Sequence, residues 1–269
     1  MERIEKLLII GCGNMGGAML AGWLAAGVAP SRFAILDPAL KGAPEGVTLY
    51  REVSEASSAG HDAVLLGFKP QQLEDLAPRL RGLAGDGVAV YSLLAGFTIS
   101  QLKSAFSGAR AHIRVMPNLA ARIGKSPIIL LENGLSEEGR EDAFAFFDKL
   151  GTAVWLAEEA KFDLVTALAG SGPGFVYRFI DALAEAAQEL GLEKAQATSL
   201  ALSMVEGASL LAAGADVSPG ALADQVASPG GMTREGLNVL DANQSLVNLL
   251  IKTLKATAER GAELSAGAD

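Results

Sequence analysis

The segment Lys6-Leu7-Leu8-Ile9-Ile10-Gly11-Cys12-Gly13-Asn14-Met15-Gly16 decides the fold. It opens with a short apolar run of the kind that forms a buried strand in a parallel sheet. The glycine motif that follows gives each glycine its own task. Gly11 permits a tight turn, Gly13 lets a pyrophosphate approach the backbone, and Gly16 lets helix and strand pack closely. The segment therefore predicts a strand, a phosphate-binding turn and a helix.

The residues after the glycine turn are those that a dinucleotide site requires. Gly17 to Ala26 indicates a helix, and Phe33-Ala34-Ile35-Leu36 indicates the next strand. Asp37 closes that strand, about 20 residues beyond the glycines, where an acid accepts hydrogen bonds from an adenosine ribose. The alternative is a glycine-rich turn in another α/β fold, which would not need this order of strand, helix and acid.

Short apolar runs alternate with helical stretches throughout the first half of the chain. Further strands are expected at 63–67, 88–92, 111–115, 128–131 and 153–155. This alternation predicts a parallel sheet with right-handed crossovers, in which ligands bind beyond the carboxyl ends of the strands. We therefore expect the following residues at strand ends and in the first turn to contact a cofactor: Asn14, Met15, Phe68, Lys69, Pro70, Leu94, Ala95, Gly96 and Asn118.

The second half of the chain has a different composition. Strand signals vanish from about Glu158, and long helices are expected at 175–190, 194–213 and 243–264. Alanine-rich helices with wide apolar faces need a cover, which favours a partner subunit over a self-contained bundle. We expect a sheet domain over 1–157 and a helical domain over 158–269.

Composition excludes several classes of function. The 269 residues are 50% apolar but contain no uninterrupted apolar run of about 18 residues, so no membrane span is expected. The start does not resemble a secretion signal, and Cys12, the single cysteine, suits a reducing, cytoplasmic compartment. The net charge of −9 argues against nucleic acid as a partner. With only two histidines and no cysteine cluster, no metal site is expected.

A second anion site is indicated near the C-terminus, at Ser228-Pro229-Gly230-Gly231-Met232-Thr233. The glycines and proline lie between two helical stretches, 219–227 and 233–242. Such a loop leaves backbone N–H groups free, and the helix after it adds its own unpaired N–H groups and positive end. A carboxylate fits this site, so the chain is expected to bind a dinucleotide and a small acidic substrate.

Taken together, the motifs resemble those of the pyrroline-5-carboxylate reductase family over nearly the whole chain. The resemblance is carried by Gly11 to Gly16 with Ala18, Lys69-Pro70, Ser92 to Gly96, Arg114 to Asn118, Leu168 to Pro173, and Pro219 to Gly231. It implies an α/β Rossmann-type parallel sheet domain followed by an all-α dimerisation domain, assembled as a homodimer or a ring of dimers. It also implies reduction of 1-pyrroline-5-carboxylate to L-proline by NADPH or NADH.

The resemblance assigns roles to residues in the second half. The backbone from Ser228 to Gly231, including Gly230, would hold the substrate carboxylate, with Met232 and Ser171 lining the site. Thr233 would be the catalytic residue, with its hydroxyl near the ring nitrogen. A cyclic imine is basic enough to be partly protonated near neutral pH, so no strong general acid is required.

Some positions depart from the family pattern. Leu119 and Met232 make the pocket more apolar than is typical, which leaves open a related cyclic imine acid as substrate or a non-catalytic dinucleotide-binding dimer. A hydroxyacid dehydrogenase would need a lysine between Ala167 and Glu185, and none is present. Asp37 would repel a 2′-phosphate and favours use of NADH, although the basic residues Arg32, Lys41 and Arg51 would partly offset this repulsion.

Overall fold

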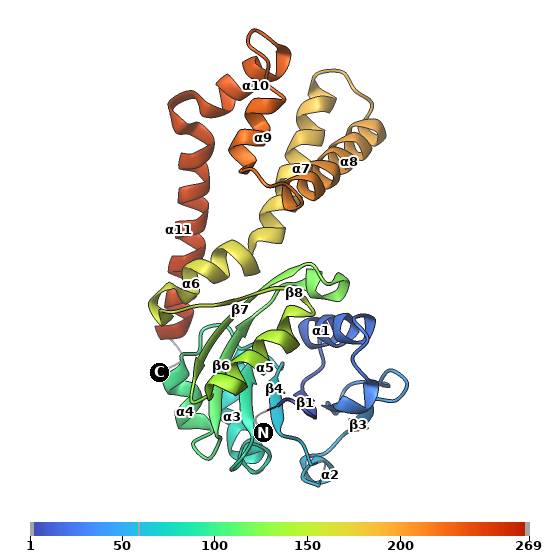
Figure 1. Cartoon of the computed structure of the whole chain (residues 1–269), viewed down its shortest axis with the longest axis vertical. Helices are drawn as coiled ribbons and strands as arrows, with labels where there is room; N and C mark the ends of the chain where they lie inside the picture. Colours follow the sequence, from blue (N-terminus) through green and yellow to red (C-terminus); the bar gives the residue numbers. More distant parts are fainter. Residues whose placement is uncertain (1–2, 59, 267–269) are drawn as a thin grey trace. The chain divides into compact units, whose positions relative to one another are not determined.

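The computed structural model describes residues 3–58 and 60–266. The fold divides into two compact units (Figure 1). The sheet unit comprises the chain up to Gly170 together with the segment from Thr257 onward, and the helical unit is Ser171–Ala256. The strands are β1 Leu7–Ile10, β2 Phe33–Leu36, β3 Thr48–Tyr50, β4 Ala63–Leu66, β5 Ala89–Ser92, β6 Ala111–Met116, β7 Ser126–Asn133 and β8 Gly151–Trp155.

The helices fall into two groups. The sheet unit contains α1 Asn14–Ala25, α2 Val53–Ala56, α3 Leu73–Leu80, α4 Ile99–Ala105, α5 Glu137–Asp148 and α6 Phe162–Val165. The helical unit contains α7 Gly172–Glu189, α8 Lys194–Ala213, α9 Pro219–Gln225, α10 Met232–Asp241 and the first part of α11 Ser245–Ala266. The predicted α/β domain followed by a helical region is confirmed. None of the helices in the described part of the chain is long and apolar enough to cross a membrane.

The strands form one sheet in the order β3-β2-β1-β4-β5-β6-β7-β8. The order 3-2-1-4-5-6 is that of a dinucleotide-binding sheet, with β1 at its centre. All neighbouring pairs are parallel except β6 and β7, which run antiparallel. The prediction of a parallel sheet therefore fails at this pair. Only nine residues, Pro117 to Lys125, join β6 to β7, and a parallel crossover needs a dozen or more.

Helices cover both faces of the sheet, and the alternation of side chains along β1 divides the core between them. Leu7 and Ile9 face one core with residues of α1 and α5. Leu8 and Ile10 face the other core with residues of α3 and α4. Because both faces are buried, the strands are continuously apolar, which is why the apolar runs located them.

An aromatic cluster anchors α1 and α5 to the sheet. Trp23 stacks on Phe33 with ring centroids 5.6 Å apart and lies 4.7 Å from the ring of Phe146. Its indole Nε1 donates to the carbonyl oxygen of Phe146 at 2.9 Å, so its polar group is satisfied in the core. Beside it, a Cβ on Gly22 would lie 2.1 Å from the carbonyl oxygen of Ala121, so only glycine fits there.

The helical unit is packed differently. Helices α7 and α8 meet through small side chains, with Ala184, Ala197 and Ala201 buried between them. Many of its large apolar side chains are exposed: Val176, Tyr177, Phe179, Leu200, Leu202, Met204, Leu210, Leu211, Val226, Val239, Leu240, Val247, Leu249, Leu250 and Ile251. Exposed apolar surface of this extent marks an interaction surface.

Candidate cofactor and substrate site

The turn between β1 and α1 has the geometry of a phosphate cradle. Gly11 has φ +82°, and a Cβ on it would lie 2.7 Å from the backbone nitrogen of Phe68. A Cβ on Gly16 would lie 3.1 Å from the carbonyl oxygen of Gly11, so helix and strand pack closely there. A Cβ on Gly13 would meet nothing within 4 Å. The open side of Gly13, at the start of α1, is therefore a fit for a pyrophosphate.

A cavity of about 820 Å³ lies beyond the carboxyl ends of β1, β2, β3 and β4. Five of the residues predicted to contact a cofactor line it: Gly11, Gly13, Asp37, Phe68 and Lys69. The sequence motifs did not single out most of the other lining residues, which include Glu52 and Val53 after β3 and Leu76, Arg79 and Leu80 on α3. Arg51, which was named only as a basic residue that offsets Asp37, also lines the cavity. Leu76 and Leu80 of α3 give the cavity an apolar side, and Asp37 and Arg51 place charged groups near the strand ends. An adenosine site needs both an apolar surface and a few polar groups.

Asp37 holds the two turns of this site together. Its Oδ2 accepts a hydrogen bond from the backbone N–H of Cys12 at 2.9 Å, and its Oδ1 accepts one from Ala39 at 2.9 Å. Burial, and then the charge of Asp37, raise the pKa of the Cys12 thiol to about 11. The thiol is therefore protonated at neutral pH, and Cys12 serves as a buried residue of the glycine turn.

The other predicted cofactor residues do not line this cavity. Asn14 and Met15 begin α1, and Pro70 begins a 3₁₀ turn, Pro70–Gln72. Leu94, Ala95 and Gly96 follow β5, where Gly96 has φ +82°. At that strand end the buried hydroxyl of Ser92 accepts a hydrogen bond from the N–H of Leu94 at 3.2 Å.

Asn118 is buried, and its side chain is bonded to the protein. Its Oδ1 accepts from the N–H of Ala120 at 2.9 Å, and its Nδ2 donates to the carbonyl oxygen of Ala169 at 2.9 Å. Its backbone N–H donates to Ser126 Oγ at 2.8 Å. Asn118 thus ties the 3₁₀ turn Leu119–Ile123 to the π-helical turn Thr166–Gly170. Its contact with a cofactor stays a prediction.

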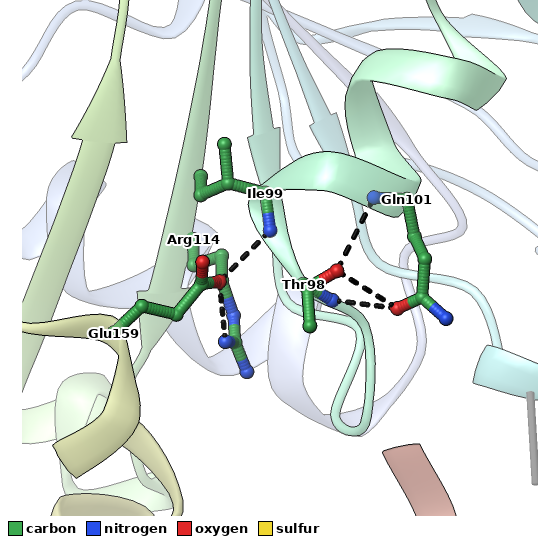
Figure 2. A network of polar contacts seen from close by, with 5 residues as sticks. All are labelled: Thr98, Ile99, Gln101, Arg114 and Glu159. Atoms are coloured by element: carbon green, nitrogen blue, oxygen red, sulfur yellow. Dashed lines mark hydrogen bonds and ion pairs between the residues drawn. The ribbon is translucent and has the colours of Figure 1, made fainter. Parts of the chain in front are cut away.

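A second network of polar contacts lies at the start of α4 (Figure 2). No sequence motif predicted that its residues contact one another. Glu159 Oε1 accepts from Arg114 Nη1 at 2.9 Å and from the N–H of Ile99 at 2.8 Å. The Arg114 side chain is only 5% exposed, and its guanidinium lies 3.6 Å from the ring centroid of Phe162. Burial lowers the pKa of Arg114 below its ordinary value, and the hydrogen bond and charge of Glu159 oppose this shift without cancelling it. This ion pair joins β6, α4 and the segment before α6.

The loop Ser228–Thr233 in the helical unit forms a tight turn before α10. Gly230 has φ +72°, and the N–H of Gly231 donates to the carbonyl oxygen of Ser228 at 2.9 Å. The first N–H groups of α10, which begins at Met232, have no partner within the helix. Thr233 lies in this first turn and is exposed, and the Met232 side chain is 95% exposed.

An ion pair fixes this turn. Arg234 Nη2 donates to Asp224 Oδ1 at 2.7 Å and to the carbonyl oxygen of Ala227 at 3.4 Å, which ties α9 to α10. The remaining predicted substrate residue, Ser171, directly precedes α7, and its hydroxyl makes no capping bond to that helix. Among the described residues no group of His, Cys, Asp and Glu could hold a metal ion.

Comparison with known proteins assigns the chain to a family. Residues 159–264 match the family model described as pyrroline-5-carboxylate reductase dimerisation, and residues 6–96 match that described as NADP oxidoreductase coenzyme F420-dependent. Pyrroline-5-carboxylate reductase 2 of Bacillus subtilis is 34% identical, covering 97% of this chain and 95% of its own. The chain belongs to the pyrroline-5-carboxylate reductase family.

Solved structures of this family have the same fold. The pyrroline-5-carboxylate reductase of Coxiella burnetii superposes with a TM-score of 0.90 at 28% identity, covering 98% of this chain and 99% of that one. The pyrroline carboxylate reductase of Plasmodium falciparum, solved with NADP bound, gives a TM-score of 0.80 at 25% identity, with 98% and 99% covered. Family membership and fold thus agree with the resemblance in the motifs.

Proposed function

We propose that this chain reduces 1-pyrroline-5-carboxylate to L-proline with a reduced nicotinamide dinucleotide. The observation that carries the proposal is the presence of two anion sites of different kinds in a chain of this family. One is the open glycine turn beside the cavity of about 820 Å³, and the other is the tight turn before α10. A dinucleotide fits the first, and a small carboxylate fits the second.

The dinucleotide is held by the end of the sheet unit. The pyrophosphate lies against the open side of Gly13 and the start of α1, including Asn14 and Met15. Asp37 accepts from the ribose with lone pairs that Cys12 and Ala39 do not use. Lys69 offsets phosphate charge. The remaining residues proposed to contact the cofactor are Gly11, Gly16, Phe68, Pro70, Leu94, Ala95, Gly96 and Asn118.

The substrate is held by the turn of the helical unit. Its carboxylate accepts hydrogen bonds from backbone N–H groups at Ser228 to Gly231 and at the start of α10. The N–H of Gly231 already donates to Ser228, so the first turn of α10 carries much of this binding. Met232 and Ser171 contact the ring, and the Thr233 hydroxyl bonds the ring nitrogen.

The reaction needs little acid–base chemistry from the protein. A reduced nicotinamide dinucleotide held at the glycine turn would supply the hydride that the C=N carbon of the protonated imine accepts, so the ring nitrogen would become an amine without further proton transfer. The chain contributes by holding the imine in position, which lowers the entropic part of the barrier. Thr233 orients the nitrogen and hydrogen-bonds the developing amine.

The proposal extends to assembly and cofactor choice. The chain acts as a homodimer through its helical domain, 158–269, while 1–157 binds the dinucleotide. The exposed apolar side chains of α7, α8, α10 and α11 support this division. Assembly of dimers into a ring is part of the same proposal. The chain uses NADH in addition to NADPH, because Asp37 favours a free ribose hydroxyl.

The test is oxidation of NADH and of NADPH by the purified protein with 1-pyrroline-5-carboxylate. A parallel assay with 1-pyrroline, the same ring without the carboxylate, isolates the role of the turn before α10. Turnover of the carboxylate with a large loss for 1-pyrroline is expected. Dinucleotide binding without turnover of either ring would contradict the proposal and favour a non-catalytic dinucleotide-binding dimer.

A related cyclic imine acid is the second candidate substrate. Met232, which begins α10 at the turn proposed to hold the carboxylate, is 95% exposed and can add an apolar contact beyond those a five-membered ring uses. A six-membered cyclic imine acid, assayed beside 1-pyrroline-5-carboxylate, distinguishes the two. A higher kcat/KM for the larger ring would reassign the substrate without changing the reaction.

A further inference from the structure

We propose that Arg51 is the residue that binds the 2′-phosphate of NADPH and so sets the choice between NADPH and NADH. The inference rests on the proposed function, because it concerns the dinucleotide of that reaction. It concerns one corner of the cavity, where β2 and β3 end. Asp37 alone would make this corner a poor site for a phosphate, and Arg51 reverses that.

The sheet register places Asp37 and Arg51 next to each other. Leu36 of β2 pairs with Tyr50 of β3, and the N–H of Asp37 donates to the carbonyl oxygen of Tyr50 at 3.1 Å. Asp37 and Arg51 are therefore the next residues in register at the carboxyl edge. Both line the cavity. A ribose bonded to Asp37 would have its 2′ position close to Arg51.

The guanidinium of Arg51 has donors to spare. Nη1 donates to the carbonyl oxygen of Pro38 at 3.2 Å and Nη2 to that of Lys41 at 3.5 Å. Both acceptors are neutral, and a guanidinium carries five N–H donors in a planar fork. The nearby Glu55 carboxylate accepts from the backbone N–H groups of Arg51 and Glu52 instead. In the described part of the chain no carboxylate forms an ion pair with Arg51.

The two other basic residues that the sequence offered as partners of a 2′-phosphate do not line the cavity. Arg32 donates through Nε to the carbonyl oxygen of Glu5 and through Nη2 to that of Ile4, and its guanidinium lies over the ring of Phe146. Lys41 meets Arg51 only through its carbonyl oxygen. Arg51 is therefore the basic residue of these three that a ribose phosphate can reach.

The charges of the corner account for use of both cofactors. With NADH, Asp37 accepts from the 2′-hydroxyl, and Arg51 keeps its bonds to the loop after β2. With NADPH, the guanidinium fork binds the phosphate through two oxygens and offsets the charge of Asp37. The corner thus accommodates a ribose with or without a 2′-phosphate, and the preference between NADPH and NADH depends on Arg51.

The experiment uses the full-length protein and has a binding readout and a kinetic one. Calorimetry measures adenosine 2′,5′-bisphosphate and 5′-AMP binding to wild type, Arg51→Ala, Arg51→Lys and Lys41→Ala. Steady-state assays measure kcat/KM for NADPH and NADH with 1-pyrroline-5-carboxylate. Lys41→Ala is the matched control, because it removes the same charge from the neighbouring loop, between β2 and β3, at a side chain that does not line the cavity.

Arg51→Ala is expected to weaken binding of the bisphosphate by about 10-fold to 100-fold and to change 5′-AMP binding little. The kcat/KM for NADPH should fall by the same factor relative to that for NADH. Arg51→Lys should lose less of the bisphosphate affinity, because lysine keeps the charge but not the planar fork of donors. Lys41→Ala should bind both nucleotides as wild type does.

Equal effects of Arg51→Ala on both nucleotides, or no effect on either, would overturn the inference. Failure of the proposed function gives a different result, because then no variant turns over 1-pyrroline-5-carboxylate. The calorimetric comparison of bisphosphate and 5′-AMP still decides the role of Arg51 in that case. The 5′-AMP affinity also verifies that each variant has kept a folded cavity.

Discussion

The sheet unit and the helical unit bury different side chains. In the sheet unit the largest buried side chains are aromatic, among them Trp23, Tyr91, Phe33 and Phe147, and they pack between α1, α5 and the sheet. In the helical unit the buried side chains are alanines, while Leu211 is 75% exposed and Val239 is 72% exposed. The first unit completes its own core, and the second requires another surface.

This difference has an energetic consequence. Burying a leucine or valine side chain contributes about 1.5–3 kcal/mol, and the helical unit leaves many such residues in water. A second copy of the chain, as the dimerisation model for residues 159–264 indicates, would supply the missing burial. The stability of the helical unit should then depend on protein concentration, whereas that of the sheet unit should not.

The largest effect is expected from charges on the exposed face of α8. Leu200, Met204 and Leu211 recur at spacings that place them on one side of the helix, and each is at least 50% exposed. Met204→Glu with Leu211→Glu should raise the dimer dissociation constant by at least about a thousandfold, because each dimer would bury four unpaired charges. Sedimentation velocity measures this change.

The control for that double variant is Ser199→Glu. It adds one negative charge, where the double variant adds two, to the face of α8 that already carries Glu206, and it should leave the association state as in wild type. A double variant that remains a dimer with wild-type turnover would show that this face is not the interface.

The second effect concerns chemistry in the helical unit. Thr233→Ala should lower kcat roughly 10-fold to 100-fold while leaving dinucleotide affinity close to wild type, because the cofactor is held by the sheet unit. Thr233→Ser, which keeps a hydroxyl, should recover most of the rate. Steady-state kinetics with calorimetry of dinucleotide binding separates the two quantities, and an unchanged kcat in Thr233→Ala rules out the proposed role.

The third effect is a local defect in the sheet unit. A Cβ on Gly22 would lie 2.1 Å from the carbonyl oxygen of Ala121 and 2.8 Å from Leu150 Cδ2. Gly22→Ala should cost about 1–3 kcal/mol of stability and lower Tm equally at every protein concentration. Gly17→Ala, whose Cβ would lie 3.9 Å from the nearest atom, is the control and should keep or raise Tm. Concentration dependence of the Gly22→Ala defect would contradict a self-contained core.

The smallest effect concerns Cys12. Burial and Asp37 raise the pKa of this thiol from its ordinary value of 9.0 to about 11. Between these values the folded protein keeps the proton and the unfolded chain loses it, so the stability present below pH 9 declines as pH rises towards 11. Urea unfolding at pH 8, 9 and 10 should show this decline in wild type and less of it in Cys12→Ala. Equal declines in both proteins would contradict the raised pKa.

Local sequence was sufficient for most of the fold. The apolar runs located seven strands, and the prediction of a helix at 194–213 matches α8, Lys194–Ala213. Strand β3 was missed because it has three residues, Thr48 is exposed, and the strand lies at the edge of the sheet. Helix α1 begins at Asn14 rather than Gly17, because the helix takes in the last three residues of the motif, Asn14 to Gly16.

The site was only partly predictable from the sequence, because some of its contacts join residues that are far apart in the chain. The glycine turn is contiguous in sequence, so its strained and close-packed positions could be assigned directly. The bonds of Asp37 to Cys12 and of Arg114 to Glu159 join residues 25 and 45 positions apart. Such pairs depend on which strands are neighbours. Arg51 follows the strand that the sequence did not predict, which is why its place in the cavity emerged only from the sheet register.

The most direct test of the account is to measure proline formed and dinucleotide oxidised in the same reaction, with 1-pyrroline-5-carboxylate and either NADPH or NADH. Equal amounts of both products are expected from the wild-type dimer. Met204→Glu with Leu211→Glu should lose most of both products, because the helical unit that carries the carboxylate turn and Thr233 then lacks its cover, while the sheet unit should still bind dinucleotide. Dinucleotide binding by the wild-type dimer with no proline formed would contradict the account.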